Sequence, residues 1–289
     1  MNARIPLYPV LLTLLVLATP AWSASNPSTH DKLQSAISGP QRSAAHKQRD
    51  SARHPLKTLE FFDVQPDMRV IEVLPEGGWY TEILAPFINA KGQLIEASFP
   101  PSSDKPFYRK MATKFRRKLA ASPDIYGDVQ VEPFSLPSYM PLGAPHSADR
   151  VLTFRNLHDF VFTNVHGAVS DAALQRFLGN VYQVLKPGGV LGVVSHRAPA
   201  DMSVAKSHKL GRLPQPWLVR EARQAGLKLE ASAAINANSK DPRTEPVYYL
   251  PPTLKQGQKN RAKYKAIGEA DNMTLKFVKP KPGADQTSQ

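Results

Sequence analysis

Short apolar runs alternate with helical patterns along most of the chain. The runs predict strands at Met68–Leu74, Gln93–Ala97, Val129–Val131, Arg150–Phe154, Val190–Val194, Leu227–Ala231 and Met273–Val278. The segments between them predict helices at Trp79–Ile88, Lys105–Ala120, Asp171–Leu185 and Trp217–Ala225. Strands that alternate with helices are typical of an α/β protein with a mainly parallel sheet and helices on both faces.

The clearest helix is Asp171–Leu185. Its apolar residues recur at the spacing of one helical face and form a single stripe. These residues are Leu174, Phe177, Leu178, Val181, Tyr182 and Leu185. The turn Lys186-Pro187-Gly188-Gly189 ends the helix and leads into Val190–Val194, a continuous apolar run of the kind that a parallel sheet buries on both faces.

Right-handed crossovers between parallel strands predict a doubly wound, Rossmann-like sheet. In such a sheet the ligand crevice lies beyond the carboxyl ends of the strands, where the strand order reverses. The residues that follow the strands are therefore the candidates for chemistry.

Two turns at strand ends carry polar groups. The turn after Met68–Leu74 contains Glu76 and the pair Gly77-Gly78. Glycines let a backbone pass close to a ligand, although paired glycines are also ordinary turn residues. The turn after Arg150–Phe154 contains Arg155, Asn156, His158 and Asp159. Its amide and carboxylate suit a ligand amine and His158 suits proton transfer, while the alternative is a capped turn with a solvated histidine.

The N-terminus has the pattern of a secretory signal peptide. Arg4 precedes the apolar run Val10–Ala18, which is too short to span a bilayer as a helix, and Ala21-Trp22-Ser23 forms a cleavage site. We therefore expect a signal peptide at 1–23, a flexible segment at 24–43, and a periplasmic or secreted protein without a transmembrane segment after cleavage. A membrane anchor is the alternative.

The composition limits the classes of site and partner. The chain has no cysteine, which excludes disulfides and thiolate metal ligands and suits an oxidising compartment. Its net charge of +13 favours a small-molecule or anionic substrate or an anionic surface. The basic segments lack interleaved stacking aromatics, so we expect no specific nucleic-acid partner. The oligomeric state does not follow from the sequence.

Together these segments resemble class I S-adenosylmethionine-dependent methyltransferases. The resemblance rests on Val70–Gly78, Asp149–His158 and the helix–turn–strand string Phe177–Leu191. More narrowly, the chain resembles an exported bacterial branch of predicted methyltransferases. The marks of that branch are Arg49-Asp50 with Arg53-His54-Pro55, the string Gly77–Pro86, and a tail that runs from Arg261 to Glu269.

The resemblance implies a fold, a cofactor and a reaction. The fold is the class I methyltransferase fold with an antiparallel final strand, spanning 44–280 and followed by a disordered tail at 281–289. The cofactor is S-adenosylmethionine and the reaction is methyl transfer to an acceptor that the sequence does not identify. The implied cofactor-binding residues are Glu72, Glu76, Gly77, Gly78, Glu96 and Asn156, with Ser98 as the alternative to Glu96 for the ribose.

The same resemblance places catalytic and substrate-side residues. His158 or Asp159 is the expected general base. The substrate-side candidates are Arg53, His54, Trp79, Tyr80, Arg155, His196 and Arg197. Arg53 and His54 suit a lid, and Trp79 and Tyr80 suit a cation–π contact with the sulfonium, with packing under the first helix as their alternative role.

The chain departs from the family's glycine pattern at two positions. An acidic residue is normally followed by three glycines at alternate positions, and here Leu74 and Glu76 replace the first two. Leu74 narrows the space for the cofactor. Glu76 places a carboxylate near the cofactor's own carboxylate, which is unfavourable unless one is protonated or a cation such as Arg53 or Arg155 intervenes.

Two other functions remain open at this stage. One is a catalytically silent relative that binds a small ligand or an anionic envelope component. The other is a metal-dependent hydrolase, which would draw its ligands from His46, His54, His158, His166, His196, Asp50 and Asp159. No two of these histidines have ligand spacing on one helix, so we expect no metal site.

Overall fold

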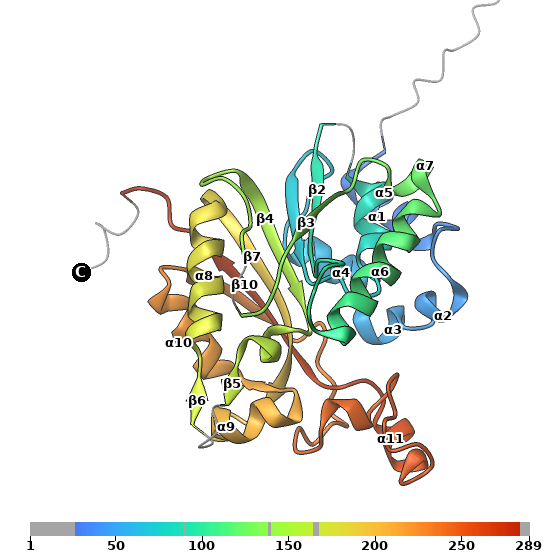
Figure 1. Ribbon diagram of the computed structural model, residues 1–289, viewed down its shortest axis with the longest axis vertical. Helices are drawn as coiled ribbons and strands as arrows, with labels where there is room; N and C mark the ends of the chain where they lie inside the picture. Colours follow the sequence, from blue (N-terminus) through green and yellow to red (C-terminus); the bar gives the residue numbers. More distant parts are fainter. Residues whose placement is uncertain (1–26, 89–90, 138–139, 164–167, 284–289) are drawn as a thin grey trace, which may run out of the picture.

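An eight-stranded sheet forms the centre of the protein (Figure 1). The structure is a computed structural model that describes residues 27–88, 91–137, 140–163 and 168–283. From one edge to the other the strands are β3 (Gln130–Pro133), β2 (Gln93–Ser98), β1 (Arg69–Val73), β4 (Ala148–Phe154), β7 (Leu185–Ala198), β10 (Asn272–Val278) and β9 (Lys228–Ala233). The short β8 (Leu213–Pro214) pairs with β7, and β5 (Phe162–Thr163) pairs with β6 (Val169–Ser170) outside this sheet.

The strand directions confirm the predicted topology. β3, β2, β1, β4 and β7 are mutually parallel, whereas β10 runs antiparallel to both β7 and β9. The chain winds from β1 towards β3 and then returns to β4 on the other side of β1, so the strand order reverses between β1 and β4. The crevice that this reversal creates at the carboxyl edge is the expected ligand position.

Helices cover both faces of the sheet (Figure 1). On one side lie α1 (Thr29–Ser38), α4 (Pro55–Phe61), α5 (Thr81–Phe87) and α6 (Pro106–Ala120), and on the other α8 (Ala172–Val184) and α10 (Gln215–Gln224). Alternate strand residues supply the two cores because successive side chains point to opposite faces. Val70 and Leu152 belong to the first core, and Ile71 and Val151 to the second. The remaining short helices are α2 (Ala44–Lys47), α3 (Asp50–Arg53), α7 (Pro123–Tyr126), α9 (Val204–Ser207), α11 (Arg261–Ile267) and the 3-10 turns Leu157–Phe160, His208–Leu210 and Val247–Tyr249.

The segment 24–43, which we expected to be flexible, contains a ten-residue helix in its described part. Helix α1 begins within it behind the cap Ser28, whose side chain accepts a hydrogen bond from the backbone N–H of Asp31. Leu33 and Ile37 are buried against α4 and α5. The apolar spacing of helix α1 gives a weak pattern because polar residues outnumber the apolar ones in this stretch. The predicted signal peptide and residues 284–289 of the predicted tail lie outside the described residues.

The elements otherwise follow the predictions closely, with one shift. β7 begins at Leu185, so Lys186-Pro187-Gly188-Gly189 is already part of an extended strand. The cause is pairing with the end of the chain, because Gly188 N–H donates to the carbonyl of Lys279 (2.8 Å) and Lys279 N–H donates to that of Gly189 (2.9 Å). Within the described residues, no helix combines the length and apolar character needed to cross a bilayer.

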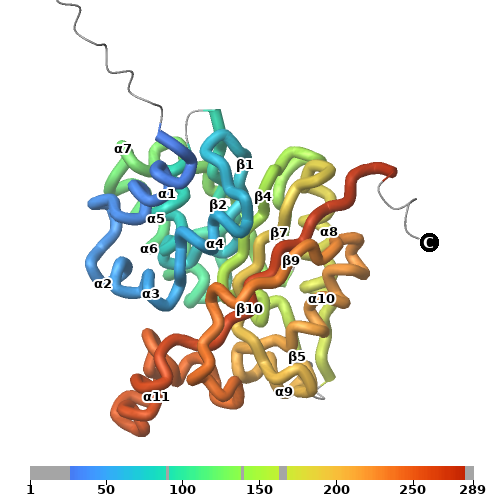
Figure 2. Tube along the Cα trace, turned by 180° about the vertical axis from the view of Figure 1, so that it is seen from behind, coloured from blue at the N-terminus to red at the C-terminus, as the bar shows by residue number. Residues whose placement is uncertain are grey.

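A long connection between β9 and β10 forms a separate lobe beside the carboxyl edge of the sheet. This connection, residues 234–271, is called the insertion below, and both views show its helix α11 projecting from the body of the protein (Figures 1 and 2). It has its own small core of Val247, Leu250, Tyr264 and Ala270. The insertion therefore forms a wall for whatever binds at that edge.

Candidate functional site

The turn between β1 and α5 has left-handed backbone at three alternate positions. Leu74, Glu76 and Gly78 have φ angles of 53°, 50° and 71°. Glycine adopts this region without steric penalty, whereas another residue loses roughly 1–2 kcal/mol. These are the three positions at which the methyltransferase motif has glycine. The turn therefore keeps the backbone of a glycine loop, although Leu74 and Glu76 carry side chains.

The two glycines of this turn have different surroundings. A Cβ at Gly78 would lie 3.0 Å from the ring of Phe115, so packing against α6 excludes a side chain there. A Cβ at Gly77 would meet no atom of the described chain within 4 Å. Gly77 lines the cavity described below, whereas Gly78 does not.

Asn156 joins the turn after β4 to the turn after β1. Its buried amide donates hydrogen bonds to the carbonyl oxygens of Val73 (2.8 Å) and Leu74 (3.5 Å), and its own oxygen accepts one from the hydroxyl of Thr153. The prediction that these two turns border one cleft is thus confirmed. Asn156 itself is engaged within the fold and does not line the cavity.

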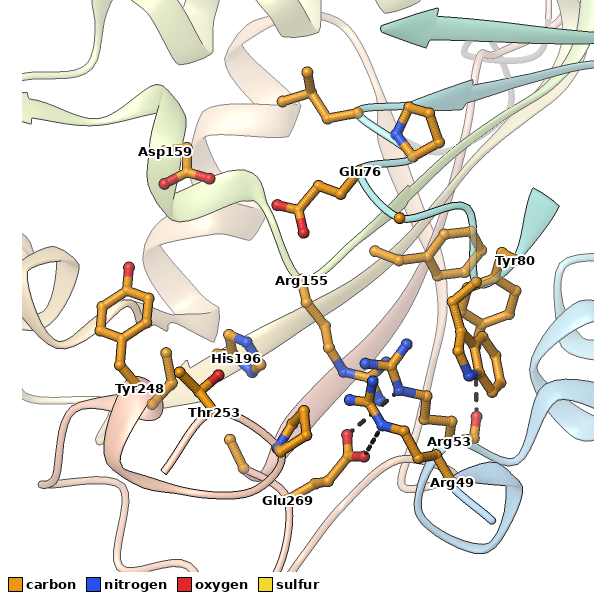
Figure 3. Close-up of a pocket in the computed structure, with 18 of the residues that line it drawn as sticks. Arg49, Arg53, Glu76, Tyr80, Arg155, Asp159, His196, Tyr248, Thr253 and Glu269 are labelled. Atoms are coloured by element: carbon orange, nitrogen blue, oxygen red, sulfur yellow. Dashed lines mark hydrogen bonds and ion pairs between the residues drawn. The ribbon is translucent and has the colours of Figure 1, made fainter. Parts of the chain in front are cut away.

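A cavity of about 580 Å³ lies beyond the two turns (Figure 3). This volume is within the roughly 300–1,000 Å³ typical of small-molecule sites. The predicted site residues in its wall are Arg53, Glu72, Glu76, Gly77, Trp79, Tyr80, Arg155, His158, Asp159 and His196. The insertion closes the opposite side with Val247, Tyr248, Pro251, Pro252, Thr253, Glu269 and Ala270.

Three guanidinium groups gather at one end of the cavity around a single carboxylate (Figure 3). Glu269 accepts a hydrogen bond from Arg49 Nε (2.6 Å) and forms an ion pair with Arg53 Nε (3.4 Å). Burial alone would raise the pKa of Glu269, but the hydrogen bond from Arg49 and the charge of Arg53 hold it below its ordinary value. Glu269 is therefore a carboxylate at neutral pH.

The third guanidinium, that of Arg155, interacts with the charge of Glu269 but is not hydrogen-bonded to it. Its three nitrogens are buried and make no hydrogen bond to the described residues. Burial lowers the pKa of Arg155, and burial together with the charge of Arg155 lowers the pKa of Arg53 to about 9. Guanidinium groups stay cationic at neutral pH in proteins, so this end of the cavity has more positive than negative charge.

The other side of the cavity is acidic. Glu76 and Asp159 face it from the two turns (Figure 3). The side chain of Asp159 is 43% exposed, and the surrounding wall raises its pKa to about 6 by desolvation. Burial and the charge of Asp159 raise the pKa of Glu76, and the charge of Arg53 opposes this rise. This side therefore favours a cation.

Two histidines and a tyrosine also line the cavity. His158 Nε2 is 3.1 Å from the hydroxyl of Tyr248 and 3.5 Å from Oδ1 of Asp159. Burial lowers the pKa of His158 to about 4, and burial and the charge of His158 lower that of His196. Both imidazoles are therefore neutral at pH 7. The rings of His158 and His196 are 5.9 Å apart.

Of the two roles considered for Trp79 and Tyr80, packing is supported by their burial, and contact with the sulfonium stays a prediction. Both line the cavity, but Trp79 is only 7% exposed and Tyr80 only 1%. The guanidinium carbons of Arg42 and Arg53 lie 4.8 and 4.7 Å from the Trp79 ring centroid, and Tyr80 stacks on Phe154. Trp79 therefore already has cationic partners from the chain itself.

The structure does not bring His54, Glu96 or Arg197 to the cavity. Arg197 makes a bidentate pair with Asp271 (2.8 and 3.0 Å). His54 has a left-handed backbone (φ 41°) between α3 and α4, where its ring forms no part of the cavity wall. Glu96 lies in the middle of β2, fully buried and in register with Glu72, and not at the strand end that a ribose would contact.

Some residues of the site escaped the sequence analysis. Arg49, Tyr248 and Glu269 line the cavity but were not predicted as site residues, and His46 was considered only as a metal ligand. Arg49 and Glu269 lie in strings that carry the resemblance, which was the available signal. The hydrogen bond between these two residues, which are 220 positions apart, cannot be predicted from a pattern in one sequence.

Of the residues proposed for a hydrolytic metal centre, four line the cavity, namely His46, His158, Asp159 and His196. Among the described residues, no three histidine, aspartate or glutamate side chains are arranged to hold a metal ion. His46 instead pairs with Glu82, and Asp50 pairs with Arg42. His166 lies outside the described residues.

Comparisons with known proteins place the fold. No family model matches the chain, and no curated protein matches it in sequence. Its structure resembles a SAM-dependent methyltransferase from Aquifex aeolicus (TM-score 0.52, 13% identity, covering 86% of this chain and 98% of the other). It also resembles an arsenic(III) S-adenosylmethionine methyltransferase from Chlamydomonas reinhardtii (0.50, 14%, 87% and 74%).

A third similar structure is the 4+2 cyclase SpnF (TM-score 0.54, 14% identity, covering 88% of this chain and 97% of the other). These identities are low, and a fold can host several chemistries. The strand order, the turn after β1 and these neighbours together show that the chain has the class I methyltransferase fold.

Proposed function

We propose that the cavity binds S-adenosylmethionine and that the protein is a methyltransferase. The observation that carries this proposal is the turn after β1. Leu74, Glu76 and Gly78 hold left-handed backbone at the three glycine positions of the family motif, at the strand reversal and beside the cavity. Two of these residues are not glycine, and the conformation persists at a cost of roughly 1–2 kcal/mol each.

The charges on this side of the cavity fit the cationic part of the cofactor. The methionine portion of S-adenosylmethionine carries a positive sulfonium and an ammonium group. The carboxylates of Glu76 and Asp159 face the cavity and would attract both charges. Repulsion between Glu76 and the cofactor's own carboxylate would be offset, because the Glu76 carboxylate would also attract the cationic groups of the cofactor.

The nucleoside part would be held differently from the family pattern. β2 ends at Ser98, and the next residue is a buried phenylalanine, Phe99, whose ring stacks on Tyr108 (3.9 Å). The position of the usual acidic residue for the ribose is therefore taken by Ser98, and an aromatic pair follows it. Phe107, with 63% of its surface exposed, and Met111 line this part of the cavity and offer apolar contact to an adenine.

The chain's own contribution to the reaction would be mostly positioning. When bound, S-adenosylmethionine supplies an electrophilic methyl group. Of the two predicted bases, Asp159 has a pKa of about 6 and His158 a pKa of about 4. A base is most effective when its pKa is near the working pH. We therefore propose that the Asp159 carboxylate accepts the proton. His158 would orient the side chains of Tyr248 and Asp159.

Titration calorimetry with S-adenosylmethionine, its demethylated product and adenosine tests the proposal. We expect the first two to bind at micromolar concentrations and the Gly77→Val variant to lose at least tenfold in affinity. A Cβ at Gly77 meets no described atom, so the added side chain would occupy ligand space without disturbing the fold. Gly179→Val is the matched control, because a Cβ there also meets no described atom and Gly179 lies on α8, outside the cavity wall.

Two results would contradict the proposal. One is the absence of heat and of a thermal shift with both the cofactor and its product, which would favour the silent relative. The other is equal binding by the wild type and Gly77→Val, which would place the ligand elsewhere.

We also propose that the protein is exported and acts in the periplasm or after secretion. The support is the sequence pattern of 1–23, the lack of cysteine and the net charge of +13. Mass spectrometry of the N-terminus in fractionated cells tests this proposal. We expect a chain that begins at Ala24 in the exported fraction, and a retained Met1 in the cytosol would contradict it.

A further inference from the structure

We infer that the arginine end of the cavity binds an oxyanion, a carboxylate or phosphate group, of the methyl acceptor. The assignment of this anion to the methyl acceptor rests on the proposed function. The anion site itself is inferred from the geometry of four residues, Arg49, Arg53, Arg155 and Glu269. These four residues come from three separate parts of the chain and meet only at this cavity.

Arg155 is the strongest argument for an anion. Its backbone is left-handed (φ 66°), directly after β4, and its guanidinium lies in the cavity wall beside Arg49 and Arg53 (Figure 3). None of its three nitrogens has an acceptor among the described residues. A buried charge without a partner is strongly unfavourable, and native proteins normally pair such groups. An incoming oxyanion would supply the missing acceptors in the planar geometry that guanidinium groups prefer.

The balance of charge points the same way. Glu269 is the carboxylate that pairs with Arg49 and Arg53 among the described residues, and it is already engaged by both. The side chains of Arg49, Arg53 and Glu269 are 22%, 12% and 12% exposed, so water screens their charges weakly. An anion with one or two negative charges would balance the charge that remains.

The acidic residues of the cavity do not fill this role. Glu76 and Asp159 lie on the opposite side and make no ion pair with the three arginines. The cavity thus separates a cation-binding side from an anion-binding side. A sulfonium on the first side and an anionic acceptor on the second would bring the two reactants together between them, next to His158, His196 and Tyr248.

Anion binding to the purified protein tests the inference. Inorganic phosphate and malonate are titrated by calorimetry into the wild type, Arg155→Gln, Arg155→Lys and Arg223→Gln, at constant ionic strength. Arg223 is exposed on α10 outside the cavity and serves as the matched control. We expect Arg155→Gln to bind the anions about 10- to 100-fold more weakly, which corresponds to the loss of a charged hydrogen bond. Arg155→Lys should lose less affinity, and Arg223→Gln should bind like the wild type. Tighter binding of phosphate or of malonate identifies the kind of oxyanion.

Thermal unfolding without added anion separates this role from a structural one. Because Arg155 makes no hydrogen bond to the described residues, Arg155→Gln should melt at the same temperature as the wild type or higher. Substitution of a residue that only supports the fold would lower the melting temperature. A lower melting temperature, or unchanged anion affinity in Arg155→Gln, would overturn the inference.

The same titrations at saturating S-adenosylmethionine decide which substrate the anion belongs to. Simultaneous binding supports an acceptor site, and mutual exclusion would overturn it, because the arginines would then hold the cofactor's own carboxylate. If phosphate binds in an Arg155-dependent way and S-adenosylmethionine does not bind at all, the anion site stands and the methyltransferase proposal fails.

Discussion

At the scale of single residues, the site is defined by side chains that the fold does not need. Glu76 has a strained backbone and a carboxylate that faces the cavity, and Arg155 combines strain with a charge that makes no hydrogen bond to the described residues. Strain of this kind persists where the surrounding structure enforces it and is concentrated at functional sites. Both residues are thus better explained by a ligand than by packing.

The charge of Glu76 can be tested with two ligands that differ by one positive charge. We expect Glu76→Gln to weaken binding of S-adenosylmethionine about 5- to 10-fold and binding of its demethylated product less, because the product keeps the ammonium but lacks the sulfonium. Calorimetry with both ligands measures the difference directly. An equal change for the two ligands would show that Glu76 does not interact with the sulfonium.

At the scale of elements, β1 and β2 carry two glutamates side by side. Glu72 and Glu96 are in register and are 3% and 0% exposed. Burial raises the pKa of Glu72 to about 7, and burial and the charge of Glu72 raise that of Glu96 well above its usual range. Neither oxygen of Glu96 has a hydrogen-bond partner in the described chain, so the pair needs at least one proton at neutral pH.

This pair predicts a stability that falls as pH rises. The folded state holds its proton more tightly than the unfolded state, so the free energy of unfolding decreases between the ordinary pKa of about 4.5 and the folded pKa of about 7, by up to roughly 3 kcal/mol for Glu72. We expect Glu96→Gln to remove this repulsion. Its stability relative to the wild type, measured by urea unfolding, should increase from pH 5 to pH 8.

Glu132→Gln is the control for this experiment, because Glu132 is exposed on the neighbouring strand β3. Its stability difference from the wild type should stay constant across the same pH range. If Glu96→Gln changed the free energy of unfolding by the same amount at every pH, the prediction that the buried pair needs a proton would be contradicted.

The insertion is fixed to the sheet by a buried ion pair. Arg212 donates two hydrogen bonds to Asp241 (2.8 and 3.1 Å), and both side chains are 0% exposed. Asp241 also accepts the backbone N–H groups of Arg243 and Asp271. Removal of one partner leaves the other charge buried and unpaired.

We therefore expect Arg212→Met to lower the free energy of unfolding by about 3–5 kcal/mol in urea unfolding. Lys263→Met is the control within the same insertion, because it breaks the exposed pair with Glu245 and should change the midpoint little. Equal effects of the two substitutions would show that the buried pair does not anchor the insertion.

The elements were largely predictable from the sequence because each has a strong local pattern. The stripe of α8 and the apolar run of β7 are clear examples. Helix α1 was not predicted because its few apolar residues, such as Leu33, stand among many polar ones. Glu96 was expected near a strand end because the predicted strand stopped at Ala97, whereas β2 extends to Ser98 and holds Glu96 inside the sheet.

At the scale of the whole molecule, the site is assembled from segments that lie far apart in the sequence. Helices α2 and α3, the turns after β1 and β4, and the insertion meet at the carboxyl edge of the sheet. The two turns were predictable, because parallel strands end at one edge. The contribution of the insertion, with Tyr248 and Glu269, was not predictable because it depends on how a long connection folds back.

Hydrogen exchange with and without S-adenosylmethionine tests the central claim, that these segments form one cofactor site. We predict slower exchange on cofactor addition in residues 73–80, 154–160 and 246–253 together, and no change in α8 and α10, which lie on the sheet away from the cavity. Unchanged exchange in all three segments, or protection confined to another part of the protein, would contradict the account.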